Sequence, residues 1–448
     1  MDDVDDSLYL SYSRRNNRPK GVDEAALSPS VASRYREDPH KFYLRKVRGL
    51  DEPFSMPLAL GVAAHGAQED FLRRRYQKDR TQKQAVRAAA QTFRDALADN
   101  WGQLDNPTIK INTDQPENPR GREEMEISLG EQIDRIQPLL HGLWASIDGL
   151  DYKLFEAQRD PQGLEISVGE LAKDRGQPHA EIESYDPHSG EYGPMPVAVV
   201  GGVPVRGRID CVGTWPDGRP GIIDHKCVSK VVPYYPVGNS WRSYEPSYNA
   251  ASDLQLDVYS AGAGIERAGF QFMLRRPQYL PDNNVLHEDW YDERDWRGRG
   301  LPGFFVNGED GLRYVGIWRP TEDDGAQEPY RLEDVRHRAA ARLRDVAEHM
   351  TESFLLHEDG VSPEIAFPAG DPEDIAKKAC PYCHFGPEGI GRCAQPRDDT
   401  EASREDYREA IKRREEICQD HPEIVERREH WAEYRRQHNL PERDTTGQ

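Results

Sequence analysis

The sequence contains no long uninterrupted apolar run. No segment approaches the roughly 20 consecutive apolar residues that a membrane-spanning helix requires, and charged residues make up 31% of the 448-residue chain. The first ten residues, MDDVDDSLYL, are acidic and lack the basic and apolar regions of a secretory signal peptide. We therefore expect a cytoplasmic protein without membrane contacts, whose 36% of hydrophobic residues are enough for at least one full core.

Basic residues are outnumbered by acidic ones. The chain carries 59 Lys and Arg against 80 Asp and Glu, which gives a formal net charge of −21. This balance argues against a nucleic-acid-binding protein, because contacts to phosphate groups need Lys and Arg. Net charge is a sum over the whole surface, however, and a binding groove needs only a local excess of positive charge. Short basic runs such as Arg73-Arg74-Arg75 and Arg275-Arg276 are candidates for such a groove.

Cysteine is also sparse. Six cysteines in a cytosolic chain of this length do not form a disulfide framework. Cys211 and Cys227 are expected to be buried core thiols. Cys380, Cys383 and Cys393 are clustered in the sequence and need a separate explanation.

The chain divides into stretches of different character, and its length favours two or three domains. Helical periodicity recurs over residues 58–78, 80–102, 121–148 and 331–356, and a valine-rich stretch that begins near residue 195 predicts strands. We expect an α/β fold with a restriction-endonuclease-like core, in which a small mixed β-sheet is flanked by helices. The expected division is a disordered N-terminal arm at 1–27, the first part of the core at 28–75, a helical insertion at 76–190, the rest of the core at 191–377, a Cys-rich segment at 378–399 and a charged, solvated helical tail at 400–448.

Residues 206–228 form a predicted β-hairpin. Two strand-like runs, 206–215 and 221–228, flank Pro216-Asp217-Gly218-Arg219-Pro220, whose residue types favour a turn. If Asp217 is the centre of the turn, residues whose numbers sum to 434 (twice 217) are opposite one another, so Asp210 is opposite Asp224. Such partners have Cβ atoms roughly 4.5–5.5 Å apart. Lys226, two residues beyond Asp224, shares its face of the strand.

Two carboxylates and a lysine on one face suit metal-dependent hydrolysis of phosphodiesters. Adjacent carboxylates repel unless a cation lies between them, and oxygen ligands favour Mg²⁺ or Mn²⁺. Such a metal lowers the pKa of bound water and polarises a phosphoryl oxygen, while Lys226 can orient the water or offset charge on the phosphate. Asp-x-Lys alone is common and usually marks a solvated strand face. Asp210 and the flanking Ile209, Ile222 and Ile223, which indicate buried strands, favour the catalytic interpretation.

Two helical pairs add further polar side chains. His65 and Glu69 share a face of one predicted helix, and Gln255 and Tyr259 share a face of a later one, both at a spacing of one turn. A single helical histidine is more often structural than a metal ligand, and a polar helix face commonly meets solvent. Spacing alone leaves both interpretations open for each pair.

Four motifs together resemble the RecB-like branch of the PD-(D/E)xK nuclease superfamily, which includes the RecB nuclease domain and the CRISPR-associated and phage exonucleases similar to it. The resemblance covers about residues 28–75 and 195–395, and four motifs in this order are far more specific than any one of them. In chain order they are Gly61-x-x-x-His65, Arg206-Gly207-Arg208-Ile209-Asp210, Ile222-Ile223-Asp224-His225-Lys226 and Gln255-x-x-x-Tyr259.

The resemblance implies a role for each matching residue. His65 on the first core helix, together with Asp210 and Asp224 on the sheet, would bind Mg²⁺ or Mn²⁺. Lys226 would be the catalytic lysine. The other matches are helical: Gln255 and Tyr259, which would steady the site and the DNA strand, and Glu69 in a supporting role.

The Cys-rich segment resembles part of a cluster site. Many members of this branch hold a [4Fe-4S] cluster through one cysteine near the N-terminus and three near the C-terminus, and Cys380, Cys383 and Cys393 match the latter three, with a longer last spacing. Asp38 stands where the first cysteine is expected. A cluster or a structural Zn²⁺ needs four ligands. An iron–sulfur cluster, a zinc site and no metal therefore stay open as alternatives, with these candidates for the fourth ligand: Asp38, His384 and Cys418.

The function that we expect is Mg²⁺- or Mn²⁺-dependent hydrolysis of DNA. The favoured form is an exonuclease that acts on single strands or ends in recombination, DNA repair or phage replication, with protein partners in a recombination complex. The alternative is a non-catalytic DNA-end-binding subunit with the same fold, and an endonuclease is the rival within the same class. The aromatic residues of 234–248 fit base stacking and core packing equally well.

Overall fold

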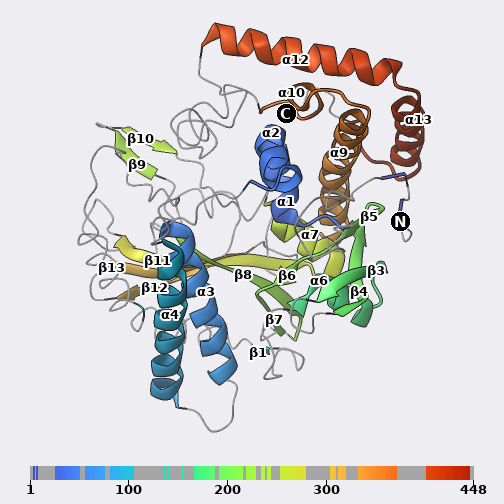
Figure 1. Ribbon diagram of the computed structural model, residues 1–448. Coiled ribbons are helices and arrows are strands. Elements are labelled where there is room, and N and C mark those ends of the chain that lie inside the picture. The colour runs from blue at the N-terminus through green and yellow to red at the C-terminus, as the bar shows by residue number, and fades with distance from the viewer. Residues whose placement is uncertain are drawn as a thin grey trace.

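A mixed β-sheet crosses the middle of the computed structural model, with helices on both sides (Figure 1). The structure describes residues 4–5, 7–8, 26–50, 56–75, 81–104, 136, 140, 153–154, 166–186, 191–214, 218–228, 234–237, 240–243, 253–278, 303–308, 311–318, 331–370 and 400–443. Within these ranges no helix combines the length and the apolar character needed to cross a membrane. The α/β architecture agrees with the expected restriction-endonuclease-like fold.

Six strands form the main sheet. β8 and β11 are parallel, whereas the other neighbours are antiparallel. Parallel neighbours require a crossover connection, and the helix α7 (Leu254–Ala263) lies in the chain between them. In order across the sheet, the strands are β1 (Lys153–Leu154), β7 (Cys211–Thr214), β8 (Pro220–Val228), β11 (Arg267–Gln278), β13 (Gly311–Trp318) and β12 (Gly303–Gly308).

Residues 76–190 differ from the purely helical insertion that we expected. They do contain the helices α4 (Gln82–Leu104) and α6 (Val168–Asp174). They also supply β1, which pairs with the edge strand β7 of the main sheet. Two smaller sheets take up the other strands of this stretch: β2 (Ile166–Ser167) with β6 (Arg208–Ile209), and β3 (His179–Asp186) with β4 (Glu191–Val200) and β5 (Val203–Val205). These strands lie outside the segments with helical periodicity, and α4 coincides with the helix predicted over 80–102.

The helices near the sheet begin where the sequence provides caps. Ser28 accepts a hydrogen bond from the Val31 amide at the start of α1 (Pro29–Glu37). Asp38 caps α2 (Pro39–Phe42), which continues as the π-helix η1 (Tyr43–Val47). Gly264, with a φ of 65°, ends α7 in the left-handed conformation that glycine adopts most readily. In Figure 1, α3 (Met56–Arg75) and α4 extend below the sheet, while α1, α7 and α9 (Leu332–Glu358) lie above it.

The charged tail is helical and most of its side chains are exposed or half-buried, but one side of it is buried against the rest of the protein. Its two helices, α12 (Glu401–Asp420) and α13 (Pro422–Gln437), pack near α9 and α10 (Pro363–Ala366), and Arg414 and Arg435 are buried there. Both arginines pair with buried glutamates of α9 at distances of 3.1 and 2.9 Å. These buried glutamates explain why Arg414 and Arg435 can be buried although the tail around them is exposed and charged. The small two-stranded sheet of β9 (Tyr234–Val237) and β10 (Ser240–Ser243) lies elsewhere, at the left of Figure 1.

Part of the expected disordered arm is also ordered. The Asp5 amide donates to the Gly202 carbonyl at 2.9 Å, and the Asp5 carboxylate lies 2.9 Å from Arg344 of α9. Asp5 is 8% exposed. A polar composition therefore did not keep Asp5 exposed: its carboxylate pairs with the buried Arg344, which also pairs with Glu348 of α9.

Candidate active site

The hairpin has the register that the sequence predicts. Cys211 pairs with Ile223 and Val212 with Ile222, so partner numbers sum to 434. Asp210 lies at a bend one residue before β7, and its Oδ2 accepts a hydrogen bond of 2.7 Å from the His225 amide of β8. The start of β7 and the centre of β8 thus place the carboxyl groups of Asp210 and Asp224 in one region.

Gln255 of α7 connects the two catalytic candidates of β8. Its Nε2 donates to Asp224 Oδ1 at 2.8 Å, and its Oε1 accepts from Lys226 Nζ at 3.2 Å. Lys226 Nζ also lies 2.5 Å from Asp224 Oδ2. The second Nε2 hydrogen is directed to Tyr259 Oη, 3.3 Å away. One amide therefore fixes the side chains of an acid, a lysine and a phenol.

His65 reaches the site from α3, which packs against β8. Its Nε2 lies 2.9 Å from Asp210 Oδ1. Burial raises the pKa of Asp210, but the hydrogen bond and charge of His65 lower it more, so the net pKa is below the ordinary value. Asp210 consequently stays ionised at neutral pH. Glu69, one turn later, pairs with Arg73 at 2.8 Å, and its supporting role stays a prediction.

Asp224 has the opposite electrostatic environment. It is 1% exposed, and burial, followed by the charge of Asp210, raises its pKa to about 7 although Lys226 pulls in the other direction. The side chain of His225 points to the other face of the strand, where burial lowers its pKa to about 4 and keeps it neutral. The carboxylate pair is therefore not fully neutralised by the side chains around it.

Two supporting contacts were not foreseen from the sequence. A Cβ built on Gly207 would lie 2.7 Å from Tyr259 Cε1, so only glycine lets that ring take its place. Asp257, which is fully buried on α7, forms ion pairs with Arg338 at 2.7 Å and with Arg342 at 3.4 Å. These pairs tie α7 to α9 between the positions of Gln255 and Tyr259. An aspartate within the Gln255-x-x-x-Tyr259 motif was the available signal.

The donor set at this site fits a hard divalent cation. Asp210 and Asp224 offer oxygen ligands and His65 is adjacent; burial and the charge of Asp210 raise the pKa of Asp224, and a cation between the two carboxylates would favour its ionised form. The contacts are pairwise, however: across the described ranges no three His, Cys, Asp or Glu side chains surround a common point. Binding a cation would therefore exchange the His65–Asp210 and Lys226–Asp224 contacts for metal contacts.

The structure describes only some of the cysteines and of the candidate ligands for a cluster or zinc. Cys211 and Cys418 are buried free thiols, and Asp38 caps α2 through the Lys41 amide at 3.0 Å. The side chain of Cys227 is not among the described ones, and the rest of this group lies outside the described residues: Cys380, Cys383, His384 and Cys393.

Comparison with protein families agrees with the geometry. The profile of the PD-(D/E)XK nuclease superfamily matches residues 26–387, which is most of the chain and includes every residue of the site. The chain belongs to the PD-(D/E)XK nuclease superfamily. No curated protein gives a significant sequence match. Superfamily membership and the arrangement of Asp210, Asp224 and Lys226 thus both point to nuclease chemistry.

Proposed function

We propose that this superfamily member is a Mg²⁺- or Mn²⁺-dependent deoxyribonuclease of the RecB-like branch, and that it acts as a cytoplasmic exonuclease on single strands or ends. One observation carries the proposal: Gln255 holds Asp224 and Lys226 within hydrogen-bonding distance of one amide, beside Asp210 and His65. Two acids and a lysine so arranged can bind a cation and a phosphate together.

Each residue of the site has a distinct role in this proposal. Asp210, Asp224 and His65 would hold the cation, which supplies an activated water and polarises a phosphoryl oxygen. Lys226, 19% exposed at its side chain, donates to a non-bridging phosphate oxygen as negative charge develops on it. Gln255 fixes the Lys226 ammonium and the Asp224 carboxylate in their relative positions before the substrate arrives.

The active-site assignment is tested by cleavage of end-labelled single- and double-stranded DNA with Mn²⁺. Asp224→Asn and Lys226→Ala should each lower the cleavage rate by at least about 10³-fold while the fold is retained, because each removes a group that acts on the reacting phosphate. Lys173→Ala is the matched control, since Lys173 is an exposed lysine paired with Glu181. Undiminished cleavage by either site variant would exclude this active site.

The same assay separates the rival functions. Stepwise loss of nucleotides from a labelled end supports an exonuclease, and internal fragments support an endonuclease. DNA binding without any cleavage by the unmodified protein would support a non-catalytic end-binding subunit. A role in recombination, repair or phage replication, with protein partners, follows only from the RecB-like branch and is proposed on that basis.

The Cys-rich segment calls for a separate measurement. We propose a [4Fe-4S] cluster held by Cys380, Cys383 and Cys393, with Zn²⁺ as the alternative. Anaerobically purified protein should be brown and contain about four irons per chain, as a [4Fe-4S] cluster requires. Colourless, iron-free protein with one zinc per chain would exclude the cluster and support the zinc site instead.

A further inference from the structure

The helix α7 contains a single charged residue, Asp257, among its ten residues. Successive residues of a helix are about 100° apart, so Asp257 lies roughly 160° away from both Gln255 and Tyr259. These two side chains face the candidate active site, whereas Asp257 is fully buried on the opposite side of the helix. A buried charge at this position requires partners.

Arg338 of α9 holds the Asp257 carboxylate through two hydrogen bonds. Its Nε donates to Oδ2 at 2.8 Å, and its Nη2 donates to Oδ1 at 2.7 Å. Arg342, one turn later on α9, adds a longer contact of 3.4 Å to Oδ2. Two parallel bonds fix the direction of a carboxylate as well as its distance, which the bond of a single lysine does not do. The pair therefore resists rotation of α7 about its own axis.

A further arginine anchors the C-terminal end of α7. Arg175, the C-cap residue of α6, donates from Nε to the Ala263 carbonyl at 2.8 Å and from Nη2 to the Gly264 carbonyl at 3.2 Å. A contact at the end of a helix limits its movement along the axis but leaves the helix able to turn. The orientation of α7 about its axis therefore depends on the contacts along its sides.

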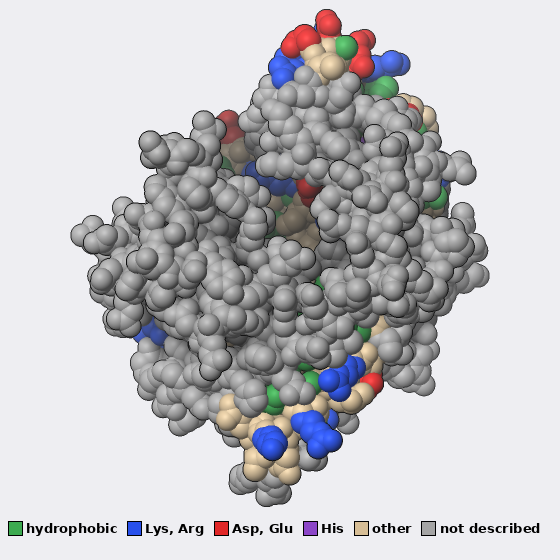
Figure 2. All heavy atoms as spheres, turned by 90° about the vertical axis from the view of Figure 1, so that its left-hand side faces the viewer, with side chains coloured by type: hydrophobic (Ala, Val, Ile, Leu, Met, Phe, Trp, Pro, Cys, Tyr) green, Lys and Arg blue, Asp and Glu red, His purple; other side chains and the backbone are tan. Residues whose placement is uncertain are grey.

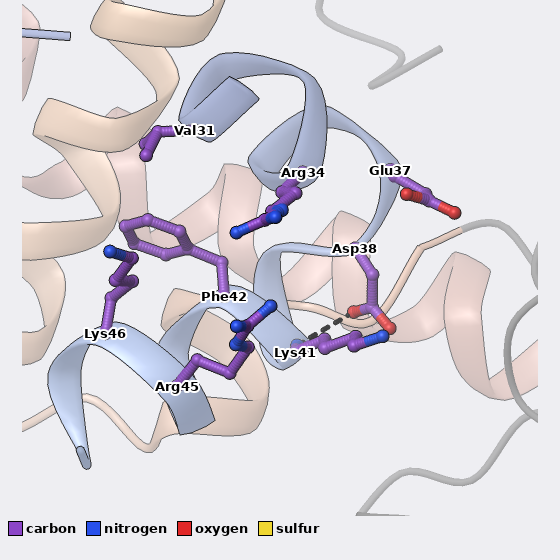
Figure 3. A pocket seen from close by; sticks show the side chains of 8 residues that line it. All are labelled: Val31, Arg34, Glu37, Asp38, Lys41, Phe42, Arg45 and Lys46. Atoms are coloured by element: carbon purple, nitrogen blue, oxygen red, sulfur yellow. Dashed lines mark hydrogen bonds between the residues drawn. The ribbon is translucent and has the colours of Figure 1, made fainter. Parts of the chain in front are cut away.

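α1 and α9 both pack against α7 above the sheet (Figure 1). A cavity of about 240 Å³ adjoins α1, α2 and η1, and Arg34 of α1 and Arg45 of η1 are among the residues that line it (Figure 3). Side chains next to a cavity lack packing contacts on that side. α1 is thus a less rigid support than α9, whose arginines bind the α7 carboxylate directly.

We propose that the Asp257–Arg338 pair positions Gln255 for the reaction at the candidate active site. The inference rests on the proposed nuclease function. Neither member of the pair touches the substrate, so both are positioning residues. A side chain about 5–6 Å from a helix axis moves by roughly 2 Å when the helix turns by about 20°. Such a movement is enough to break the hydrogen bonds of Gln255 with Asp224 and Lys226, which are 2.8 and 3.2 Å long.

Arg338→Lys is the central test, because it keeps the positive charge and removes the second hydrogen bond. At a temperature well below melting, the maximal rate of Mn²⁺-dependent DNA cleavage should fall about tenfold, while the KM for DNA stays unchanged. Arg338→Gln, which also retains a donor to Asp257, should give a similar loss. An unchanged rate in both variants would overturn the proposal.

Two other arginines supply matched controls. Arg435 of α13 binds Glu348 of α9 through the same Nε and Nη2 atoms, so Arg435→Lys should lower the melting temperature without changing the cleavage rate. Arg408 pairs with Glu401 on the charged helix α12, at the top of Figure 2, and Arg408→Lys should change neither quantity. A tenfold loss of rate in Arg435→Lys would assign the effect of Arg338→Lys to general destabilisation and overturn the proposal.

A double variant tests whether the pair acts through Gln255. In protein that carries Gln255→Ala, Arg338→Lys should lower the rate by less than about twofold, because the side chain that the pair positions is absent. A further loss of about tenfold, equal to that in the unmodified background, would show that the pair acts by another route and would overturn the proposal.

Calorimetric binding of Mn²⁺ without DNA separates this proposal from that of the nuclease function. Arg338→Lys should weaken Mn²⁺ binding by about threefold, because Asp224 loses its fixed position, whereas Arg435→Lys should not weaken it. If the unmodified protein cleaves no DNA but shows this difference, the positioning role stands and the nuclease proposal fails. If it cleaves DNA and Arg338→Lys changes neither the rate nor Mn²⁺ binding, the positioning role alone is wrong.

Discussion

Asp224 and Glu352 are two buried carboxylates with opposite electrostatic environments. Burial and, after it, the charge of Asp210 raise the pKa of Asp224 to about 7, although the one cationic side chain in contact, Lys226, lowers it. Glu352 of α9 contacts three guanidinium groups, those of Arg414, Arg428 and Arg443. Burial raises the pKa of Glu352, but these charges lower it well below the ordinary value.

The difference matches the two roles that we propose for these carboxylates, cation binding for Asp224 and helix packing for Glu352. Around Glu352, positive charge exceeds negative charge, so folding itself completes the ion-pair network. Around Asp224, a second carboxylate competes for the one lysine, and either a proton or a bound cation can offset the remaining negative charge. A buried carboxylate with too few partners is therefore the mark of a binding site, whereas one with several arginines joins helices.

The largest expected effect is on the structural side of this comparison. Glu352→Gln should destabilise the protein by about 3–5 kcal/mol, because it leaves buried guanidinium groups without a counter-ion. Denaturant unfolding measures the change. Glu401→Gln, which breaks the exposed pair with Arg408, should cost about 0–1 kcal/mol. Equal effects of both substitutions would show that the α9 network does not hold the C-terminal helices.

Substitutions around Asp224 should change the cleavage rate rather than the stability of the protein. Gln255→Ala should lower Mn²⁺-dependent cleavage by about 10–100-fold, because Asp224 and Lys226 lose the amide that positions them. In the same variant the Mn²⁺ concentration that gives half of the maximal rate should rise. A purely structural role of Gln255 would not cause this rise. Gln419→Ala, at an exposed glutamine of α12 that bonds Glu415, should leave both quantities unchanged.

A smaller loss of rate is expected from Gly207→Ala. The added methyl group would meet Tyr259 Cε1 at 2.7 Å and displace the ring that bonds Gln255. We expect about a tenfold lower cleavage rate, because small displacements of positioned groups are costly. Gly193→Ala is the control, since its methyl group would enter open space. An unchanged cleavage rate in Gly207→Ala would mean that cleavage does not depend on this position of the Tyr259 ring.

The smallest expected effect is a pH-dependent shift in melting temperature without metal. The folded-state pKa of Asp224 is raised, so its favourable contribution is present below about 3.8 and is lost as pH rises to about 7. Asp224→Asn should therefore raise the melting temperature by about 2–4 °C at pH 8 and by less at pH 5. Asp210→Asn should instead lower the melting temperature by similar amounts at pH 5 and pH 8, because the lowered pKa of Asp210 contributes stability above about 3.8 that is lost only as pH falls below that value. Identical shifts at both pH values would contradict this account of Asp224.

Local sequence signals predicted the centre of the site well. The turn residues around Asp217 fixed the register, and a period of two placed Asp224 and Lys226 on one face. The one-turn spacing of Gln255 and Tyr259 put both on one side of α7, where they bond each other. These features depend on residues near one another in the chain, for which strand and helix geometry is sufficient.

Contacts between distant segments could not be predicted in the same way. The parallel pairing of β8 with β11 and the ion pair of Asp5 with Arg344 join stretches whose patterns are unrelated. The burial of Arg414 also contradicts its charged sequence neighbourhood, because its partner Glu352 belongs to another helix. The catalytic roles themselves, and the Cys-rich segment, stay predictions for the experiments described above.

The contacts of Ser7 have a consequence for the time at which the fold can be completed. The Ser7 carbonyl accepts from Arg427, and its hydroxyl accepts from Trp431 Nε1 at 2.8 Å, across 420 and 424 residues of chain. At ribosomal rates of about 5–20 residues per second, those partners appear roughly 20–85 s after Ser7. Ser7 therefore has to wait through almost the whole of translation for these two partners, and cellular chaperones have that interval in which to bind it.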